Sequence, residues 1–259
     1  MRSLFMSFLM ILTVTLSAAE NYKGGPVEVT TLDELKSASA ALGRPAAILY
    51  MNKVSTCPLH NGQCSRWLEN PVLANYIILK VDWKSNGAEL KAVQQLRQKS
   101  NDKAGSMIPM MFLVDADTAY KDVLPYNLDG AIVNKSLQKE VNDVGLVLPV
   151  ADVHAIDKEL TKVSPLLVEG KTDSARTILK KVKSIAAKAP KAGFAKTYAE
   201  AESAFNVRVL ADCEELLKPL GEKSAEERVK KINPILLKYK DLLSEATNKA
   251  ITEAARRTP

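Results

Sequence analysis

Two of the three cysteines in this chain lie seven positions apart, in the stretch Cys57-Pro58-Leu59-His60-Asn61-Gly62-Gln63-Cys64. A cysteine thiolate is both a nucleophile and a soft metal ligand, so three kinds of chemistry are open to this pair. As a redox pair, Cys57 and Cys64 would exchange disulfides with client proteins. As a structural pair, the two would form a stabilising disulfide, which is common in exported proteins. Together with His60 they could bind Cu(I) or Zn(II), although a structural zinc site normally has four ligands.

Two local conformations compete for this stretch. Proline is favourable at the first helical position, and a helix from Pro58 would separate Cys57 and Cys64 by about 10 Å along its axis. A disulfide requires Cα atoms within about 7 Å, so a helix would prevent it. The dipeptide Asn61-Gly62 instead favours a turn, which would fold the loop back and bring the two sulfurs together. Because glycine inside a helix costs about 1 kcal/mol relative to alanine, we expect the turn and the bridged loop.

The elements around this stretch alternate between helix and strand. Helical patterns begin at Thr31 and at Gly87, and apolar runs typical of buried strands cover residues 46–51, 77–83 and 110–114. This alternation predicts βαβ units with a parallel core. The turn signal Asp115-Ala116-Asp117 predicts an antiparallel edge strand after residue 114. We also expect a weaker strand that includes Ala131 and Ile132, followed by a helix over residues 136–144.

Three landmarks occur in the order in which thioredoxin-fold proteins carry them. Residues 47–57 resemble the family's central strand leading to its first active-site cysteine, and residues 70–82 resemble the next helix and strand of its exported branch. Ser106-Met107-Ile108-Pro109, followed by an apolar strand, resembles the family's cis-proline loop. Over roughly residues 30–145, this resemblance implies an α/β thioredoxin-like domain with Cys57 as nucleophile. It also implies that Pro109 is a cis-proline that presents backbone to the client.

The chain departs from the family pattern at several of these positions. The family's second cysteine follows the first by three positions, where this chain has His60, and the next cysteine is Cys64. Met51 stands where the family has a buried acid, and Thr56 replaces a tryptophan. A protonated His60 beside Cys57 would favour its thiolate, so His60 is a candidate modulator.

The second half of the chain has a different character. From Val150 onward no strand-like run remains, and apolar residues recur at helical spacing in four segments. One face is marked by Ile156 through Leu167, and the last by Val229 through Leu243. We predict an all-α extension, either a bundle or helical hairpins, over residues 150–259, after a thioredoxin-like domain over residues 20–149. Within these domains Cys213 is interpreted as a buried free thiol, and Trp67 and Trp83 as packing residues.

The first 19 residues have the pattern of a secretory signal. Arg2 precedes an apolar run of 13 residues from Leu4 to Leu16, and Ser17-Ala18-Ala19 supplies small residues for cleavage before Glu20. The run is shorter than the roughly 20 residues that span a bilayer. We therefore expect export, to a periplasm or to the medium, and no membrane span after the signal is removed.

Charge and composition narrow the expected partners. The net charge of +6 is thinly spread and carries no interleaved aromatic residues, which argues against nucleic-acid binding. No phosphate-binding glycine loop is present, and no cofactor is expected. The expected partners are exported client proteins or a redox partner protein. The expected functions are thiol–disulfide exchange or, alternatively, non-catalytic interaction by a module whose cysteine pair is structural.

Overall fold

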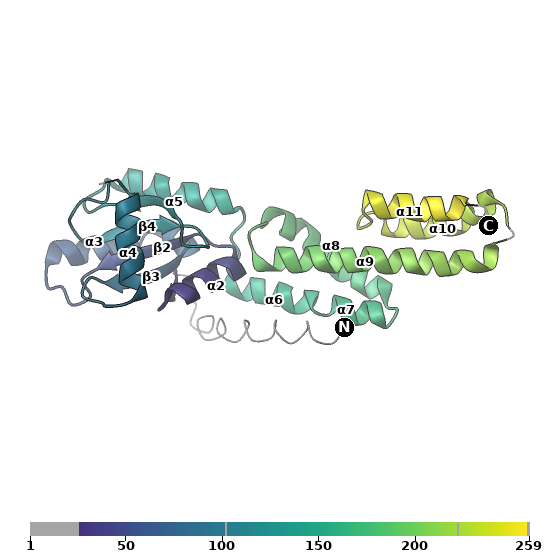
Figure 1. Cartoon of the computed structure of the whole chain (residues 1–259), viewed down its shortest axis with the longest axis horizontal. Helices are drawn as coiled ribbons and strands as arrows, with labels where there is room; N and C mark the ends of the chain where they lie inside the picture. The colour runs from purple at the N-terminus through teal and green to yellow at the C-terminus, as the bar shows by residue number, and fades with distance from the viewer. Residues whose placement is uncertain (1–25, 102, 222, 258–259) are drawn as a thin grey trace. The chain divides into compact units, whose positions relative to one another are not determined.

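The computed structural model describes residues 26–101, 103–221 and 223–257 (Figure 1). The signal sequence predicted over residues 1–19 lies outside the described residues. The chain divides into two compact units. The first ends at Ala151 and also contains Ala189–Gly193, and the second consists of Asp152–Lys188 and the chain from Phe194 onward.

The first unit is built on a five-stranded mixed sheet. Its strands are β1 (Val27–Val29), β2 (Ala46–Met51), β3 (Ile77–Asp82), β4 (Met110–Val114) and β5 (Tyr120–Leu124), in the order β1-β3-β2-β4-β5. Strands β1 and β2 run parallel to β3, whereas β4 is antiparallel to β2 and β5 to β4. The central strands are apolar along nearly their whole length because both faces of the sheet are covered.

Helices cover both faces of this sheet. They are α2 (Leu32–Leu42), α3 (Pro58–Leu68), the 3-10 turn η1 (Pro71–Asn75), α4 (Ala88–Lys99) and α5 (Gly130–Val144), and Figure 1 shows α4 crossing the sheet. Trp67 of α3 and Leu137 of α5 belong to one buried cluster with alternate residues of β2, β3 and β4. The hydroxyl of Tyr76 donates a hydrogen bond of 2.8 Å to the Leu137 carbonyl and fastens α5 to this layer. The predicted α/β thioredoxin-like fold of the N-terminal part is confirmed.

One predicted strand is wrong. Ala131 and Ile132 lie in the first turn of α5, because the Asp129 carboxylate accepts a hydrogen bond of 2.8 Å from the Ala131 N–H and caps the helix. The edge strand is β5, which follows a turn held by Asp115. The carboxylate of Asp115 accepts hydrogen bonds from the N–H groups of Asp117 (3.0 Å) and Ala119 (2.8 Å).

The C-terminal part is all-α, as predicted. Its helices are α6 (Val150–Leu160), α7 (Val163–Val168), α8 (Thr172–Lys188), α9 (Gly193–Leu217), η2 (Lys218–Leu220), α10 (Ala225–Tyr239) and α11 (Glu245–Arg256). The single helix expected over Val229 through Leu243 is interrupted, because Ser244 caps a new helix by accepting a hydrogen bond of 3.1 Å from the Thr247 N–H. None of the helices within the described ranges has the length and apolarity needed to cross a bilayer.

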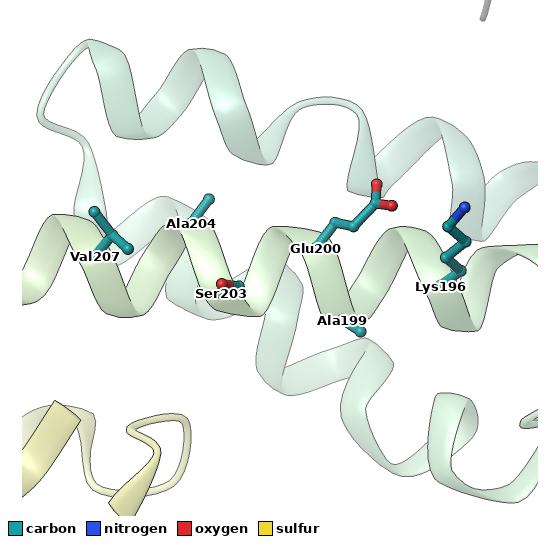
Figure 2. Close-up of a pocket in the computed structure, with 6 residues that line it drawn as sticks. All are labelled: Lys196, Ala199, Glu200, Ser203, Ala204 and Val207. Carbon is teal, nitrogen blue, oxygen red and sulfur yellow. The ribbon is translucent and has the colours of Figure 1, made fainter. Parts of the chain in front are cut away.

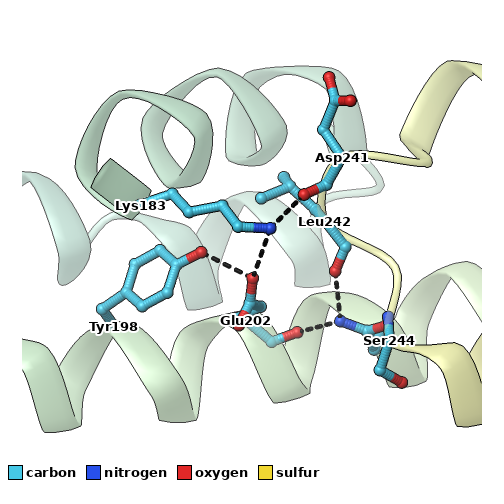
Figure 3. A network of polar contacts seen from close by, with 7 residues as sticks. Lys183, Tyr198, Glu202, Asp241, Leu242 and Ser244 are labelled. Atoms are coloured by element: carbon cyan, nitrogen blue, oxygen red, sulfur yellow. Dashed lines mark hydrogen bonds and ion pairs between the residues drawn. The ribbon is translucent and has the colours of Figure 1, made fainter. Parts of the chain in front are cut away.

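A buried asparagine joins the helices of the second unit. The amide of Asn206 donates hydrogen bonds to the carbonyls of Glu202 (2.7 Å) and Leu242 (3.0 Å), and its oxygen accepts one of 2.8 Å from the Ser244 N–H. Tyr198 donates to the Glu202 carboxylate at 2.6 Å, and Lys183 lies 3.8 Å from it (Figure 3). These contacts hold the α10–α11 connection against α8 and α9.

Candidate functional site

The register of the sheet gathers three connections at one edge. Strand β2 ends at Met51 opposite Asp82, the last residue of β3, and Tyr50 is paired with Met110, the first residue of β4. The segments that follow β2, follow β3 and precede β4 therefore meet at this edge. Cys57 lies in the first segment and Pro109 at the end of the third. The peptide bond between Ile108 and Pro109 is cis.

Local hydrogen bonds shape the segment from β2 to Cys57. Asn52 accepts hydrogen bonds of 3.2 Å from Val54 and from Ser55, through its side-chain and backbone oxygens respectively. The Ser55 hydroxyl accepts one from the Cys57 N–H at 3.2 Å, and the Ser55 carbonyl accepts one from the Asn61 amide at 2.9 Å. Cys57 is thereby held at the N-cap of α3, with its side chain exposed.

The turn expected at Asn61-Gly62 is wrong, because α3 continues through both residues. Its buried face carries His60, Gln63, Cys64 and Trp67, which recur at the spacing of a helix. Burial of Trp67 in the core of the unit stabilises the helix. This gain offsets the unfavourable helix propensity of glycine.

The helix separates the two cysteines. Cys57 and Cys64 are both free thiols, the first exposed and the second only 5% exposed. Seven residues of helix span about 10 Å, beyond the roughly 7 Å between Cα atoms that a disulfide permits. The bridged loop is thus not the conformation found here. Burial raises the pKa of the Cys64 thiol, and the positive charge of Lys80 opposes this only in part.

His60 is buried and links the helix to the segment before it. Its Nε2 accepts a hydrogen bond of 3.1 Å from the Asn52 N–H, which assigns the ring proton to Nδ1. Nδ1 lies 3.2 Å from the Asn61 side-chain oxygen and 4.0 Å from the Cys64 sulfur. The ring's partners are thus Asn52, Asn61 and Cys64, and modulation of Cys57 by His60 stays a prediction.

The metal hypothesis finds no support in this geometry. Among the described residues, no three His, Cys, Asp or Glu side chains come together as a group that could hold a metal ion. Cys57 and Cys64 lie too far apart along α3, and His60 already uses both ring nitrogens in protein contacts.

Exposed apolar side chains surround the edge that carries Cys57. We call Val54, Leu59, Trp83 and Met107 the apolar rim; each lies in, or directly next to, one of the three connections, and Leu59 is 72% exposed. The Trp83 N–H donates a hydrogen bond of 2.8 Å to the Met51 carbonyl, which places its backbone beside β2. Trp67 is buried, as expected of a packing residue, whereas Trp83 is only partly covered and 44% exposed.

A shallow groove on the second unit contains none of the predicted site residues. It follows one face of α9 and is lined by Lys196, Ala199, Glu200, Ser203, Ala204 and Val207 (Figure 2). These side chains offer neither a thiol nor an imidazole. Cys57 and Pro109, in contrast, lie at the sheet edge of the first unit, where Cys57 is exposed.

Comparisons with known proteins add little to this description. No protein-family model matches the chain, and no curated protein matches it. One similar solved structure is the solution structure of an uncharacterized thioredoxin-like protein from Clostridium perfringens, with 16% sequence identity and a TM-score of 0.30. The match covers 47% of this chain and 86% of that one. A TM-score this low carries no argument about function.

Proposed function

We propose that this chain is an exported thioredoxin-like protein that exchanges disulfides with other exported proteins through Cys57. The observation that carries the proposal is an exposed thiol at the start of α3, on the sheet edge that also carries the cis peptide bond at Pro109. The first N–H groups of a helix have no intrahelical partner, so they favour a negative group at this position.

The exchange step needs only the client disulfide and the Cys57 thiolate. The thiolate attacks one sulfur of the client, so that a Cys57–client disulfide forms while the client's own disulfide breaks. The released client sulfur leaves as a thiolate and takes a proton from water. The apolar rim would hold apolar client side chains beside Cys57, and the backbone at Pro109 would align the client segment.

The second candidate function is a non-catalytic interaction module on the same surface. The observation in its favour is the position of Cys64, which is buried and about two helical turns from Cys57. In this conformation no second thiol is available to release a bound client. A protein of this kind would bind exported partners through the apolar rim without turnover.

Trapping of a mixed disulfide separates the two functions. The reduced protein is mixed with a peptide that contains one disulfide, quenched with acid and analysed by intact mass. For exchange, Cys64→Ser should accumulate one peptide per chain on Cys57, and the control Cys57→Ser should accumulate none. If Cys57 reacts no faster than the same cysteine in an unstructured peptide spanning residues 52–63, which lacks Cys64, the interaction module is the better account.

Export is part of the proposal and has its own test. The support is the composition of residues 1–19, with Arg2, the apolar run and the small residues before Glu20. The protein isolated from its source should begin at Glu20, as N-terminal sequencing would show. A chain that still begins at Met1 and is found inside the cell would refute export without touching the chemistry of Cys57.

A further inference from the structure

We propose that Cys64 resolves the Cys57–client disulfide by opening the first two turns of α3, so that the helical form of residues 58–64 and the Cys57–Cys64 disulfide exclude one another. This inference rests on the proposed function, because it concerns the step after Cys57 has reacted. The conformation of residues 58–64, helical or open, would then depend on the redox state of the Cys57–Cys64 pair.

The exclusion follows from helix geometry. Cys57 is the N-cap of α3 and Cys64 lies seven residues along it, which corresponds to about 10 Å. The Cα atoms of a disulfide lie within about 7 Å of each other. In addition, Cys64 is buried within the first unit, whereas a client attached to Cys57 would be at the surface. The two sulfurs can meet only if residues between them leave the helix.

The first two turns are held less firmly than the last. Pro58, Leu59, Asn61 and Gly62 are all exposed, although His60, Gln63 and Cys64 are buried. Two side-chain hydrogen bonds tie these turns to the preceding segment: His60 accepts one from the Asn52 N–H, and Asn61 donates one to the Ser55 carbonyl. The last turn is anchored by Trp67, which is fully enclosed in the core of the unit. Opening can therefore stop before Trp67 and leave the core intact.

Gln63 and Gly62 lower the free energy needed to open the first two turns of α3. Gln63 is 2% exposed, yet neither its amide nitrogen nor its oxygen has a hydrogen-bond partner among the described residues. A buried polar group without a partner disfavours the closed state, and opening would return the amide to water. Gly62 is the residue with the poorest helix propensity apart from proline, and a β-carbon at its position would meet no atom within 4 Å.

The resolving step balances without a further reactant. The exposed Cys64 sulfur attacks the Cys57 sulfur, the Cys57–Cys64 bond forms, and the bond to the client breaks. The Cys64 proton passes to water, and the departing client thiolate takes a proton from water. Overall the client disulfide becomes two thiols and the protein's two thiols become a disulfide. A dithiol partner protein would then reduce the pair and allow α3 to close.

A chromogenic disulfide observes both steps in one experiment. The probe is 5,5′-dithiobis(2-nitrobenzoic acid), and the protein carries Cys213→Ser so that only the pair can react. Attack by Cys57 releases a first equivalent of coloured thiolate, and resolution by Cys64 releases the second. We expect Gly62→Ala to slow the second release about fivefold, since the alanine stabilises the closed helix by about 1 kcal/mol, and to leave the first unchanged.

The matched control is Gly130→Ala, at an exposed helical position of α5 where a β-carbon also meets no atom within 4 Å. It should change neither release. Absence of the first release would refute the proposed function itself. A first release without a second, or a second release as fast in Gly62→Ala as in the parent, would overturn helix opening alone. Hydrogen exchange of the oxidised protein supplies an independent check: the amides of residues 61–64 should lose protection, whereas the Glu69 amide, which donates to the Ser65 carbonyl, should keep it.

Discussion

Replacing Gly62 with alanine tests the helix on which the whole site depends. Gly62 lies inside α3, is exposed, and has no atom within 4 Å of the place that a β-carbon would occupy. The substitution therefore adds no contact and creates no clash. What remains is the difference in helix propensity between glycine and alanine, about 0.8–1.0 kcal/mol in favour of alanine.

The assay is urea unfolding of the reduced protein followed by tryptophan fluorescence. Both tryptophans of the chain, Trp67 and Trp83, belong to the first unit, so the signal reports on that unit alone. With a slope of about 1–3 kcal/mol per molar urea, the midpoint should rise by roughly 0.3–1 M at unchanged slope. The control is Gly43→Ala, which should lower the midpoint strongly. Gly43 has φ +63°, and its β-carbon would lie 2.4 Å from the Ala192 nitrogen of the same unit.

A drop in stability for Gly62→Ala would refute this reasoning. An Asn-Gly turn places glycine at positive φ, where alanine is strained, so a loss of about 1 kcal/mol would show that the turn is present. In that case residues 57–64 would form the bridged loop, and the separation of Cys57 from Cys64 would no longer hold. The sign of one measurement thus decides between the two local conformations.

Three further predictions concern thiol access, a half-buried acid and a buried amide. Iodoacetamide should modify Cys57 rapidly and spare Cys64 and Cys213 until denaturant is added, because burial shields these two thiols and raises their pKa. Rapid addition of two carbamidomethyl groups per chain, counted by intact mass, would contradict this. Asp157→Asn should raise the melting temperature at pH 7 but not at about pH 3.5. Burial raises the pKa of Asp157 in the folded protein, so the charged carboxylate disfavours folding only at pH values above the pKa of the unfolded chain, about 3.9. An equal rise in melting temperature at both pH values, measured by calorimetry, would argue against this cause. Asn206→Ala should destabilise the second unit by about 2–3 kcal/mol, because buried backbone groups lose their partners; a loss below about 0.5 kcal/mol in thermal circular dichroism would show that the network is dispensable.

The sequence predicts the core of the first unit well, for a physical reason. Residues 46–51 and 110–114 are apolar without interruption, and Pro45 and Pro109 bound them at strand length, which is typical of a strand covered on both faces. The strand expected at Ala131 and Ile132 failed because a few apolar residues fit a strand and a helix equally well. The deciding residue was Asp129, whose carboxylate caps α5, and its position before the apolar run was visible in the sequence.

The site was predicted in its parts but not in its conformation. A cysteine followed by proline suits a helix N-terminus, and Cys57 lies there. The preference of Asn61-Gly62 for a turn was overridden by tertiary packing, since the face with Cys64 and Trp67 is buried only if the helix continues. The exposure of Trp83 follows from the end of β3 at Asp82, which pairs with Met51 of β2. This pairing involves residues far from Trp83 in the sequence.

Because of the spacing of the two cysteines, the two candidate functions differ only in the free energy needed to open α3. When two cysteines are three residues apart on a helix, the resolving thiol lies one turn away, so a mixed disulfide can be resolved without unfolding. At a spacing of seven, the proposed resolution would wait for two turns of α3 to open, and the lifetime of a client complex would grow tenfold for each 1.4 kcal/mol that opening requires. A low opening free energy makes the protein an exchange catalyst, whereas a high one makes it a covalent binding module with the same residues. Under the proposed mechanism, the hydrogen bonds of His60 and Asn61 and the unpartnered amide of Gln63 would set that free energy and with it the lifetime of the client complex.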